Sequence, residues 1–123
     1  MKVSIIIPIR NEELVLKNIV DQLENKLKNL PYEIVLINDF SSDNTFLILE
    51  KLIQNKNQFK LFNNKKKGLG GAISEGINKS TGELICIMMS DLSDDIEDFK
   101  KYYRIIKEEN IDAVFGSRFI KES

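Results

Sequence analysis

The sequence predicts an α/β domain in which a largely parallel β-sheet is covered by helices on both faces. Three observations predict this class. Short, uninterrupted apolar runs, typical of strands buried on both faces, recur along the chain. Segments with apolar residues at helical spacing separate these runs. Polar and acidic residues follow several of the runs directly, as expected where parallel strands end beside a ligand.

Length and composition predict a single domain, 1–123, without a nucleic-acid partner. The chain has 123 residues, 42% of them hydrophobic and 30% charged, and a formal net charge of -1. It contains no histidine, which removes the commonest zinc ligand and leaves carboxylate sites for hard metals. The only cysteine, Cys86, lies in an apolar run, and the apolar run near the start is too short to span a membrane. We therefore expect a cytoplasmic protein.

The first strand is predicted at Val3–Ile9, which is apolar and β-branched, with Pro8 near its carboxyl end. A helix should begin at Asn11 and Glu12 and end before Pro31. Its apolar stripe consists of Leu16, Ile19, Val20, Leu23, Leu27 and Leu30. A second buried strand is predicted at Glu33–Asn38, and polar residues follow it.

A second helix is predicted from about Asn44 to Gln54, with Ser42 or Asp43 as its N-cap. A short strand at Leu61 and Phe62 should come next. A lysine and glycine segment, 65–71, then leads into a third helix.

The fourth strand is predicted over the apolar residues Leu84–Met89, and Asp91 follows almost directly. A fourth helix is predicted at Asp95–Glu109, with Ile96, Phe99, Tyr103 and Ile106 on its buried face. A last strand is predicted at Ala113–Phe115, followed by Arg118.

Right-handed crossovers between parallel strands would bring several acidic and amide side chains to one edge of the sheet. These are Asn11, Glu12, Asp39, Asp43 and Asp91. Each has a structural alternative. Asp91 could cap a helix instead of binding a ligand, and Asp39 could stabilise a turn instead of contacting a base or ribose. Glu12 could be an acid in a first helical turn, and Asp43 fits a helix cap better than a ligand contact.

The remaining candidates have structural alternatives too. Asp94, Asp95, Glu97 and Asp98 are best explained as the start of a helix. Gly68, Gly70 and Gly71 could cradle a phosphate with Lys67, but they match neither phosphate-loop spacing, and lysines 65–67 by default form a solvated run. Arg118 could neutralise a diphosphate, or it could be a surface arginine without a functional role.

The ordered motifs are more specific than any single residue. They are SIIIPIRNEE, EIVLINDFSSDNT, KKGLGGAISEGINKSTGE, MMSDLSDD and AVFGSRF. In this order they resemble the nucleotide-sugar-binding half of a family 2 glycosyltransferase with the Rossmann-like GT-A fold. The resemblance is strongest to the dolichyl- and polyprenyl-phosphate sugar synthases, and it covers essentially the whole chain.

This resemblance implies a set of site residues. Pro8, Asn11 and Glu12 match the nucleoside motif of the first strand, and Asp39 matches the acid that contacts the base. Lys67 and Gly68 match the segment that lines the ribose or phosphates, Asp91 matches the ligand of Mg²⁺ or Mn²⁺, and Arg118 matches the arginine near the diphosphate. No catalytic base is identified.

Three positions depart from the family pattern. The common Asp-x-Asp becomes Met89, Ser90 and Asp91, so the first acid is missing. Phe40 replaces a turn glycine, and Arg10 replaces an aromatic residue. One carboxylate is still sufficient, because Mg²⁺ often takes only one or two and completes its shell with water and phosphate oxygens.

The chain stops just after the fifth motif, where family members continue into an acceptor-binding half. We therefore expect an N-terminal donor-binding half of an enzyme that transfers a sugar, with inversion, from a nucleotide-diphosphate sugar to a polyprenyl phosphate or a glycan. The alternatives are a nucleotide-sugar-binding module without turnover and, on a related fold, a sugar-phosphate nucleotidyltransferase. Membrane association would come from downstream segments. An open sheet edge predicts a homo-oligomer of the isolated chain.

Overall fold

The protein forms one mixed β-sheet with helices on both faces, as the sequence predicts. The computed structural model describes residues 1–91, 95–109 and 119–121. Its elements are β1 (Val3–Ile9), α1 (Leu16–Leu27), β2 (Tyr32–Asn38), α2 (Thr45–Leu52), β3 (Phe59–Asn63), α3 (Leu69–Lys79), β4 (Leu84–Ile87), α4 (Asp95–Glu109) and β5 (Phe119–Lys121). Among these residues the strand order is β3-β2-β1-β4-β5. The first four strands are parallel, and β5 is antiparallel to β4.

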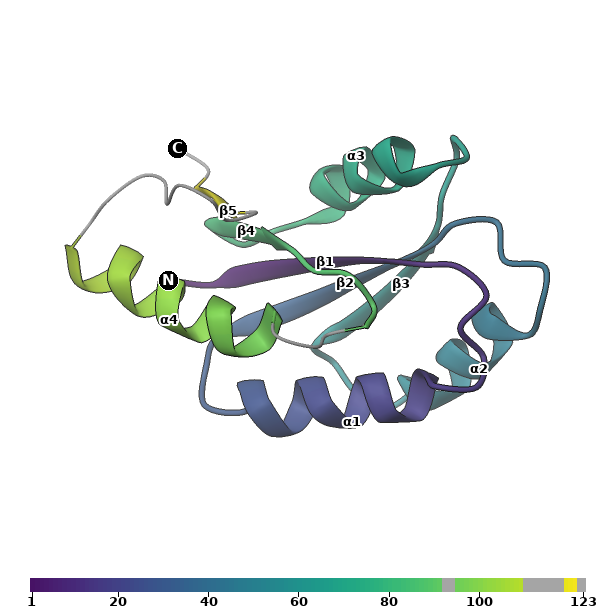
Figure 1. Cartoon of the computed structure of the whole chain (residues 1–123), viewed down its shortest axis with the longest axis horizontal. Helices are drawn as coiled ribbons and strands as arrows, with labels where there is room; N and C mark the ends of the chain where they lie inside the picture. Colours follow the sequence, from purple (N-terminus) through teal and green to yellow (C-terminus); the bar gives the residue numbers. More distant parts are fainter. Residues whose placement is uncertain (92–94, 110–118, 122–123) are drawn as a thin grey trace.

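The layers follow from the direction in which the chain crosses the sheet. From β1 to β3 the chain moves one way, and α1 and α2 pack on one face together with α4. The connection from β3 to β4 runs the opposite way, so a right-handed crossover places α3 on the other face. Figure 1 shows α3 on one side of the sheet and the remaining helices on the other.

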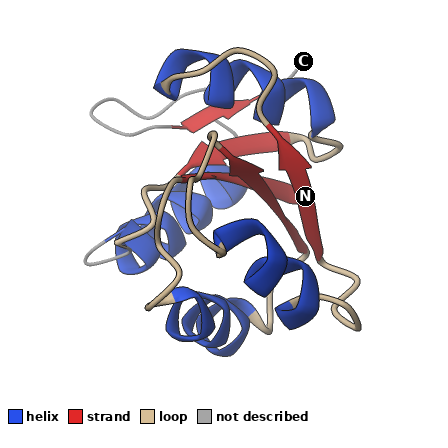
Figure 2. Ribbon diagram, turned by 90° about the vertical axis from the view of Figure 1, so that its right-hand side faces the viewer, coloured by secondary structure: helices blue, strands red, loops and turns tan. Residues whose placement is uncertain are grey.

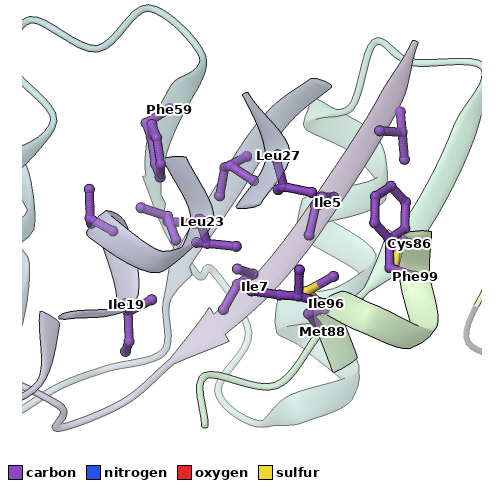
Figure 3. Packing of buried hydrophobic residues seen from close by; sticks show 14 of the residues in the cluster. Ile5, Ile7, Ile19, Leu23, Leu27, Phe59, Cys86, Met88, Ile96 and Phe99 are labelled. Carbon is purple, nitrogen blue, oxygen red and sulfur yellow. The ribbon is translucent and has the colours of Figure 1, made fainter. Parts of the chain in front are cut away.

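The strands alternate their side chains between two apolar clusters, which explains their uninterrupted apolar sequences. In β1, Ile5 and Ile7 face the larger cluster beneath α1, α2 and α4, whereas Ile6 faces the smaller cluster beneath α3. Figure 3 shows Ile5 and Ile7 among Leu23 of α1 and Phe99 of α4. Both faces of the central strands are therefore buried.

Several boundaries differ from the prediction, and two of them bear on the candidate site. Helix α1 begins at Leu16 instead of Asn11 and ends at Leu27. Residues 11–14 are drawn out of the helix because Asn11, at φ +52°, bonds to the loop after β2. The explanation of Glu12 as an acid in a first helical turn is therefore wrong. Strand β4 ends at Ile87, although the Met88 N–H still donates to the Ile6 carbonyl (2.9 Å).

The final segment was only partly foreseen. The predicted strand at 113–115 and Arg118 lie outside the described residues, and so does Asp94. The antiparallel strand β5 was not predicted, because three residues carry little periodic signal. Helix α4 has the predicted bounds, which confirms Glu97 and Asp98 as part of a helix start. No helix in the described ranges combines the length and apolar character needed to cross a membrane.

A buried carboxylate ties the strands together at the edge where they begin. Glu33 of β2 is 2% exposed and accepts hydrogen bonds from Ser4 Oγ, the Thr81 N–H and Lys60 Nζ, each at 2.6 Å. Ser4 Oγ accepts in turn from the Gly82 N–H at 2.7 Å. The cluster joins β1, β2, β3 and the turn before β4, so it stabilises the scaffold at the edge opposite the candidate site.

Candidate functional site

The predicted site residues gather where β1, β2, β3 and β4 end, at what we call the carboxyl edge. The loops at this edge face the viewer in Figure 2. The chain order reverses between β1 and β4, and such a reversal is where open α/β sheets bind ligands. A hydrogen bond spans this point, from Ser90 Oγ after β4 to Glu12 Oε1 after β1 (3.3 Å). Glu12 and Asp91, which adjoins Ser90, therefore lie on neighbouring loops.

Pro8 supports this edge from inside the sheet. It is buried in β1 and pairs with Ile37 of β2. Ile6, two residues earlier, turns its carbonyl toward β4, and β4 has ended by the level of Pro8. The missing N–H of proline therefore costs no ladder hydrogen bond, which explains a proline within a central strand.

The loops after β1 and β2 are locked together. Asn11 Oδ1 accepts from the Ser42 N–H (2.8 Å), and the Asn11 N–H donates to Ser41 Oγ (3.0 Å). The next residue continues the pattern, because the Glu12 N–H donates to Thr45 Oγ1 (3.0 Å). No local pattern predicts this pairing, because each bond joins positions about 30 residues apart.

The carboxylates of Glu13 and Asp43 complete this lock. Glu13 Oε2 accepts from the Asn44 N–H (3.1 Å). Asp43 accepts from the N–H groups of Thr45 (3.0 Å) and Glu13 (3.4 Å) and from Thr45 Oγ1 (2.6 Å). The Thr45 hydroxyl is the main cause that lowers the pKa of Asp43. Asp43 therefore holds the start of α2, as predicted, although the N-cap position itself is Asn44.

The lock can be tested at Asn11, which contributes both a side chain and a left-handed backbone. Asn11→Gly keeps the backbone conformation and loses the side-chain hydrogen bonds, so we expect a loss of about 1 kcal/mol in the free energy of unfolding. Asn11→Ala should lose about 1 kcal/mol more, because alanine disfavours positive φ. Urea unfolding of both variants measures the difference. Equal stability of the two variants would contradict this account.

Asp39 positions the loop after β3. Its side chain is 8% exposed, and Oδ1 accepts from Asn64 Nδ2 (2.9 Å) and from the Gly68 N–H (3.0 Å). Asn64, which the sequence analysis missed, also donates to the carbonyls of Lys66 (2.6 Å) and Gly68 (3.2 Å). Within the described residues, Asp39 Oδ2 accepts no hydrogen bond. Asp39 therefore orders the loop after β3, and its contact with a base or ribose stays a prediction.

The surroundings of Asp39 keep it ionised. Burial alone would raise its pKa, but the hydrogen bonds from Asn64 and Gly68 and the positive charges of Arg10 and Lys67 lower it below the ordinary value. Arg10 follows β1 and Lys67 follows β3, so cations flank the carboxylate on both sides. The site thus offers an anionic acceptor for N–H or O–H donors beside cations suited to phosphate.

The glycine segment forms a tight entry into α3. Gly68 occupies the N-cap position with φ +114°, which a residue with a side chain rarely adopts. A Cβ on Gly71 would lie 1.9 Å from the Lys66 carbonyl oxygen, so the loop can fold onto the helix only at a glycine. Lys66 and Lys67 are exposed, and Lys65 Nζ lies 4.0 Å from Glu75 Oε1. The segment places backbone N–H groups and lysines at the edge beside Asp39.

Asp91 is exposed in the turn after β4. The described residues contain no cluster of three or more histidine, cysteine or acidic side chains that could hold a metal ion on its own. A single exposed carboxylate nevertheless fits Mg²⁺ or Mn²⁺, provided that phosphate oxygens and water complete the shell. This carboxylate is therefore compatible with a metal ion that is also bound by a phosphate ligand.

Exposed large apolar side chains mark the same edge. In the described part of the chain they are Leu14, Val15, Phe40, Leu47, Leu69 and Met89. All six lie in the loops after β1, β2 and β4 or in the first turns of α2 and α3. Apolar exposure restricted to one edge indicates a surface that contacts a ligand or another part of a protein.

Comparison with known proteins decides the family. The protein-family model described as glycosyl transferase family 2 matches residues 4–123 of the chain. The chain belongs to this family.

Two curated relatives are similar along most of the chain. Dolichol-phosphate mannosyltransferase of Pyrococcus furiosus is 34% identical over 121 residues, which cover 98% of this chain and 34% of that protein. Undecaprenyl-phosphate 4-deoxy-4-formamido-L-arabinose transferase of Proteus mirabilis is 32% identical over 121 residues, covering 95% and 36%.

Solved structures share the fold of this chain. Residues 1–349 of S. aureus TarS, in complex with UDP, align with a TM-score of 0.71 and 28% identity, covering 91% of this chain and 34% of that chain. The mannosyltransferase PcManGT of Pyrobaculum calidifontis, in complex with GDP-Man and Mn²⁺, aligns with a TM-score of 0.65 and 20% identity, covering 72% and 27%. These likenesses confirm the GT-A fold. The chain spans about a third of the length of the relatives it matches.

Proposed function

We propose that the carboxyl edge binds the nucleoside diphosphate of a sugar donor. The observation that carries this proposal is the convergence of Glu12, Asp39, Gly68 and Asp91 at the ends of four parallel strands in a family 2 chain. Asp39 Oδ2 would accept from the base or ribose. Arg10 and the 65–68 loop would neutralise the diphosphate, and Arg118 is proposed for the same role from outside the described residues.

Asp91 would hold Mg²⁺ or Mn²⁺ together with the diphosphate oxygens. Such a metal stabilises the negative charge that develops as the diphosphate leaves. PcManGT, which shares the fold, was solved with Mn²⁺ and a nucleotide sugar, and this supports the proposal. Because Asp91 is the only acid retained from the family's Asp-x-Asp, we expect weak metal binding without nucleotide and stronger binding with it.

We further propose that the whole protein transfers the sugar, with inversion, to a polyprenyl phosphate. The two curated relatives are named for dolichol-phosphate and undecaprenyl-phosphate, which supports a lipid phosphate acceptor. Such an acceptor is already anionic, so it attacks without a strong general base, and no such base is identified in the sequence.

A binding module without turnover is the second candidate function. Sugar transfer by this chain to any acceptor would exclude it. Self-association through the sheet edges stays a prediction that light scattering can test.

The donor site is tested by Asp91→Ala. Isothermal titration of the chain with UDP and GDP in the presence of Mn²⁺ should show saturable binding of at least one nucleotide. Asp91→Ala should weaken that binding by about tenfold or more, because the metal loses its protein ligand. Replacing Mn²⁺ with EDTA should have the same effect on the wild type and little further effect on the variant.

Asp98→Ala is the matched control, since Asp98 is an exposed acid on α4. It should bind nucleotide like the wild type. The proposal is wrong if the wild type binds neither nucleotide, or if Asp91→Ala binds as well as Asp98→Ala does.

A further inference from the structure

Phe40 combines two features that are unfavourable for a phenylalanine. Its φ is +56°, in the left-handed region that bulky residues avoid. Its side chain is 48% exposed, and within the described residues it belongs to neither apolar cluster. Packing in the fold therefore explains neither the residue nor its conformation. An outlier of this kind, held at a ligand-binding edge, indicates a functional role.

The backbone around Phe40 cannot relax, because both neighbours are fixed. On one side, the Asp39 N–H donates to the Ile9 carbonyl (2.8 Å), and Asp39 Oδ1 is bound by the loop after β3. On the other side, Ser41 Oγ accepts from the Asn11 N–H (3.0 Å). The turn thus presents the ring at the carboxyl edge, and the ordering entropy of its backbone is already lost before any ligand binds.

The immediate surroundings limit what the ring can contact. Asp39, the preceding residue, keeps Oδ2 available for an N–H or O–H donor, and Arg10 and Lys67 provide positive charge around it. The cations can bind phosphates, and the carboxylate can accept a hydrogen bond from an N–H or O–H group of the ligand. A flat exposed aromatic ring adds a surface for a planar, aromatic group. Of the parts of a sugar donor, only the nucleobase is planar and aromatic.

We propose that Phe40 stacks against the nucleobase of the donor and so contributes to nucleotide selectivity. This inference rests on the proposed donor site at the carboxyl edge. Stacking tolerates any base, because each base has a π face, so the ring favours nucleotides over phosphates without a base. Phe40 thus supplies base affinity, whereas the neighbouring Asp39 supplies a polar contact.

Tryptophan fluorescence gives a direct test, because the sequence contains no tryptophan. Phe40→Trp places a single indole at the proposed contact. UDP or GDP with Mn²⁺ should quench its emission saturably, and inorganic pyrophosphate with Mn²⁺ should leave it unchanged. Asn57→Trp is the matched control, because Asn57 is also exposed but lies before β3, at the opposite edge of the sheet. Its emission should not respond to nucleotide. Equal responses of the two indoles would overturn the proposal.

A second measurement separates stacking from a structural role. Phe40→Asn removes the ring and tolerates positive φ, so the thermal midpoint should stay the same or rise by a few degrees. Its affinity for UDP or GDP should fall by about fivefold or more, whereas Phe40→Tyr should keep wild-type affinity. If Phe40→Asn binds like the wild type, stacking is wrong although the donor site stands. If the wild type itself binds neither nucleotide, the donor site and the stacking both fail.

Discussion

Replacing Glu33 with alanine is expected to lower the free energy of unfolding by about 3 kcal/mol. The loss is large because Glu33 is 2% exposed and accepts hydrogen bonds from Ser4, Lys60 and Thr81. Without the carboxylate, the buried Ser4 hydroxyl and the Thr81 N–H lose their acceptor. The side-chain hydrogen bonds that link β2 to β1 and β3 are lost as well. Urea unfolding followed by circular dichroism measures the change.

Lys17→Ala provides the control for Glu33. It also removes an ion pair, between Lys17 and Asp21 (2.7 Å), but this pair is exposed and lies within one turn of α1. Exposed pairs of this kind contribute less than about 0.5 kcal/mol, because water and salt screen them. If Glu33→Ala is no less stable than Lys17→Ala, the buried cluster does not stabilise the fold as argued.

The same cluster predicts a dependence of stability on pH. Burial would raise the pKa of Glu33, but the hydrogen bonds from Lys60, Ser4 and Thr81 outweigh burial and lower this pKa from 4.5 to about 2. Because the folded state holds the lower pKa, the stabilisation is complete above about pH 4.5 and is lost as the pH falls toward 2. The difference in the free energy of unfolding between the wild type and Glu33→Gln should therefore shrink by about 3 kcal/mol as the pH falls from about 4.5 toward 2.

Replacing Asn64 should have the largest effect on the candidate site itself. Asn64 is 6% exposed, and its amide donates to Asp39 Oδ1 and to the carbonyls of Lys66 and Gly68, while Oδ1 accepts from the Lys66 N–H. Asn64→Ala leaves these groups without their partner. We expect the free energy of unfolding to fall by about 2 kcal/mol and affinity for nucleotide to fall about tenfold, because the loop loses its order.

Asn64→Asp separates loop order from charge. A new carboxylate would face Asp39 Oδ1, which now accepts from Asn64 Nδ2 at 2.9 Å. Two carboxylates this close resist joint ionisation, so Asn64→Asp should be less stable near pH 7 than near pH 4, relative to Asn64→Ala. Asn57→Ala, at an exposed position before β3, should stay within about 0.5 kcal/mol of the wild type. A pH-independent difference between the two Asn64 variants would contradict the proximity of the carboxylates.

The sequence was sufficient for the α/β class and for most of the elements, because most of them carry their own local signal. The apolar run at Val3–Ile9 predicts a strand buried on both faces, and the structure buries every residue of β1. The stripe from Leu16 to Leu27 predicts the buried face of α1. The reversal of strand order follows less directly, because strand order depends on which elements pack together and not on any one segment.

The sequence also predicted that the candidate residues gather at one edge, and the structure brings Asn11, Glu12, Asp39 and Asp91 to it, since parallel strands end together. It named Asp39 and Asp91 because acids directly follow apolar runs, and it named Gly68 from its position at a helix start. It missed Asn64 and Glu33. One asparagine after a short strand carries no distinctive pattern, and a glutamate at the start of a strand is ordinarily expected to be exposed.

By itself, then, the sequence determined the α/β class, the order of its elements and the residues available at the carboxyl edge, because short-range periodicity and strand ends encode these. Only the tertiary structure decided how those residues are used. It removed residues 11–14 from α1, gave Asp39 its partners from the loop after β3, and held Phe40 at positive φ with an exposed ring. The physical reason is that these outcomes depend on hydrogen bonds between positions about 30 residues apart, which no local pattern specifies.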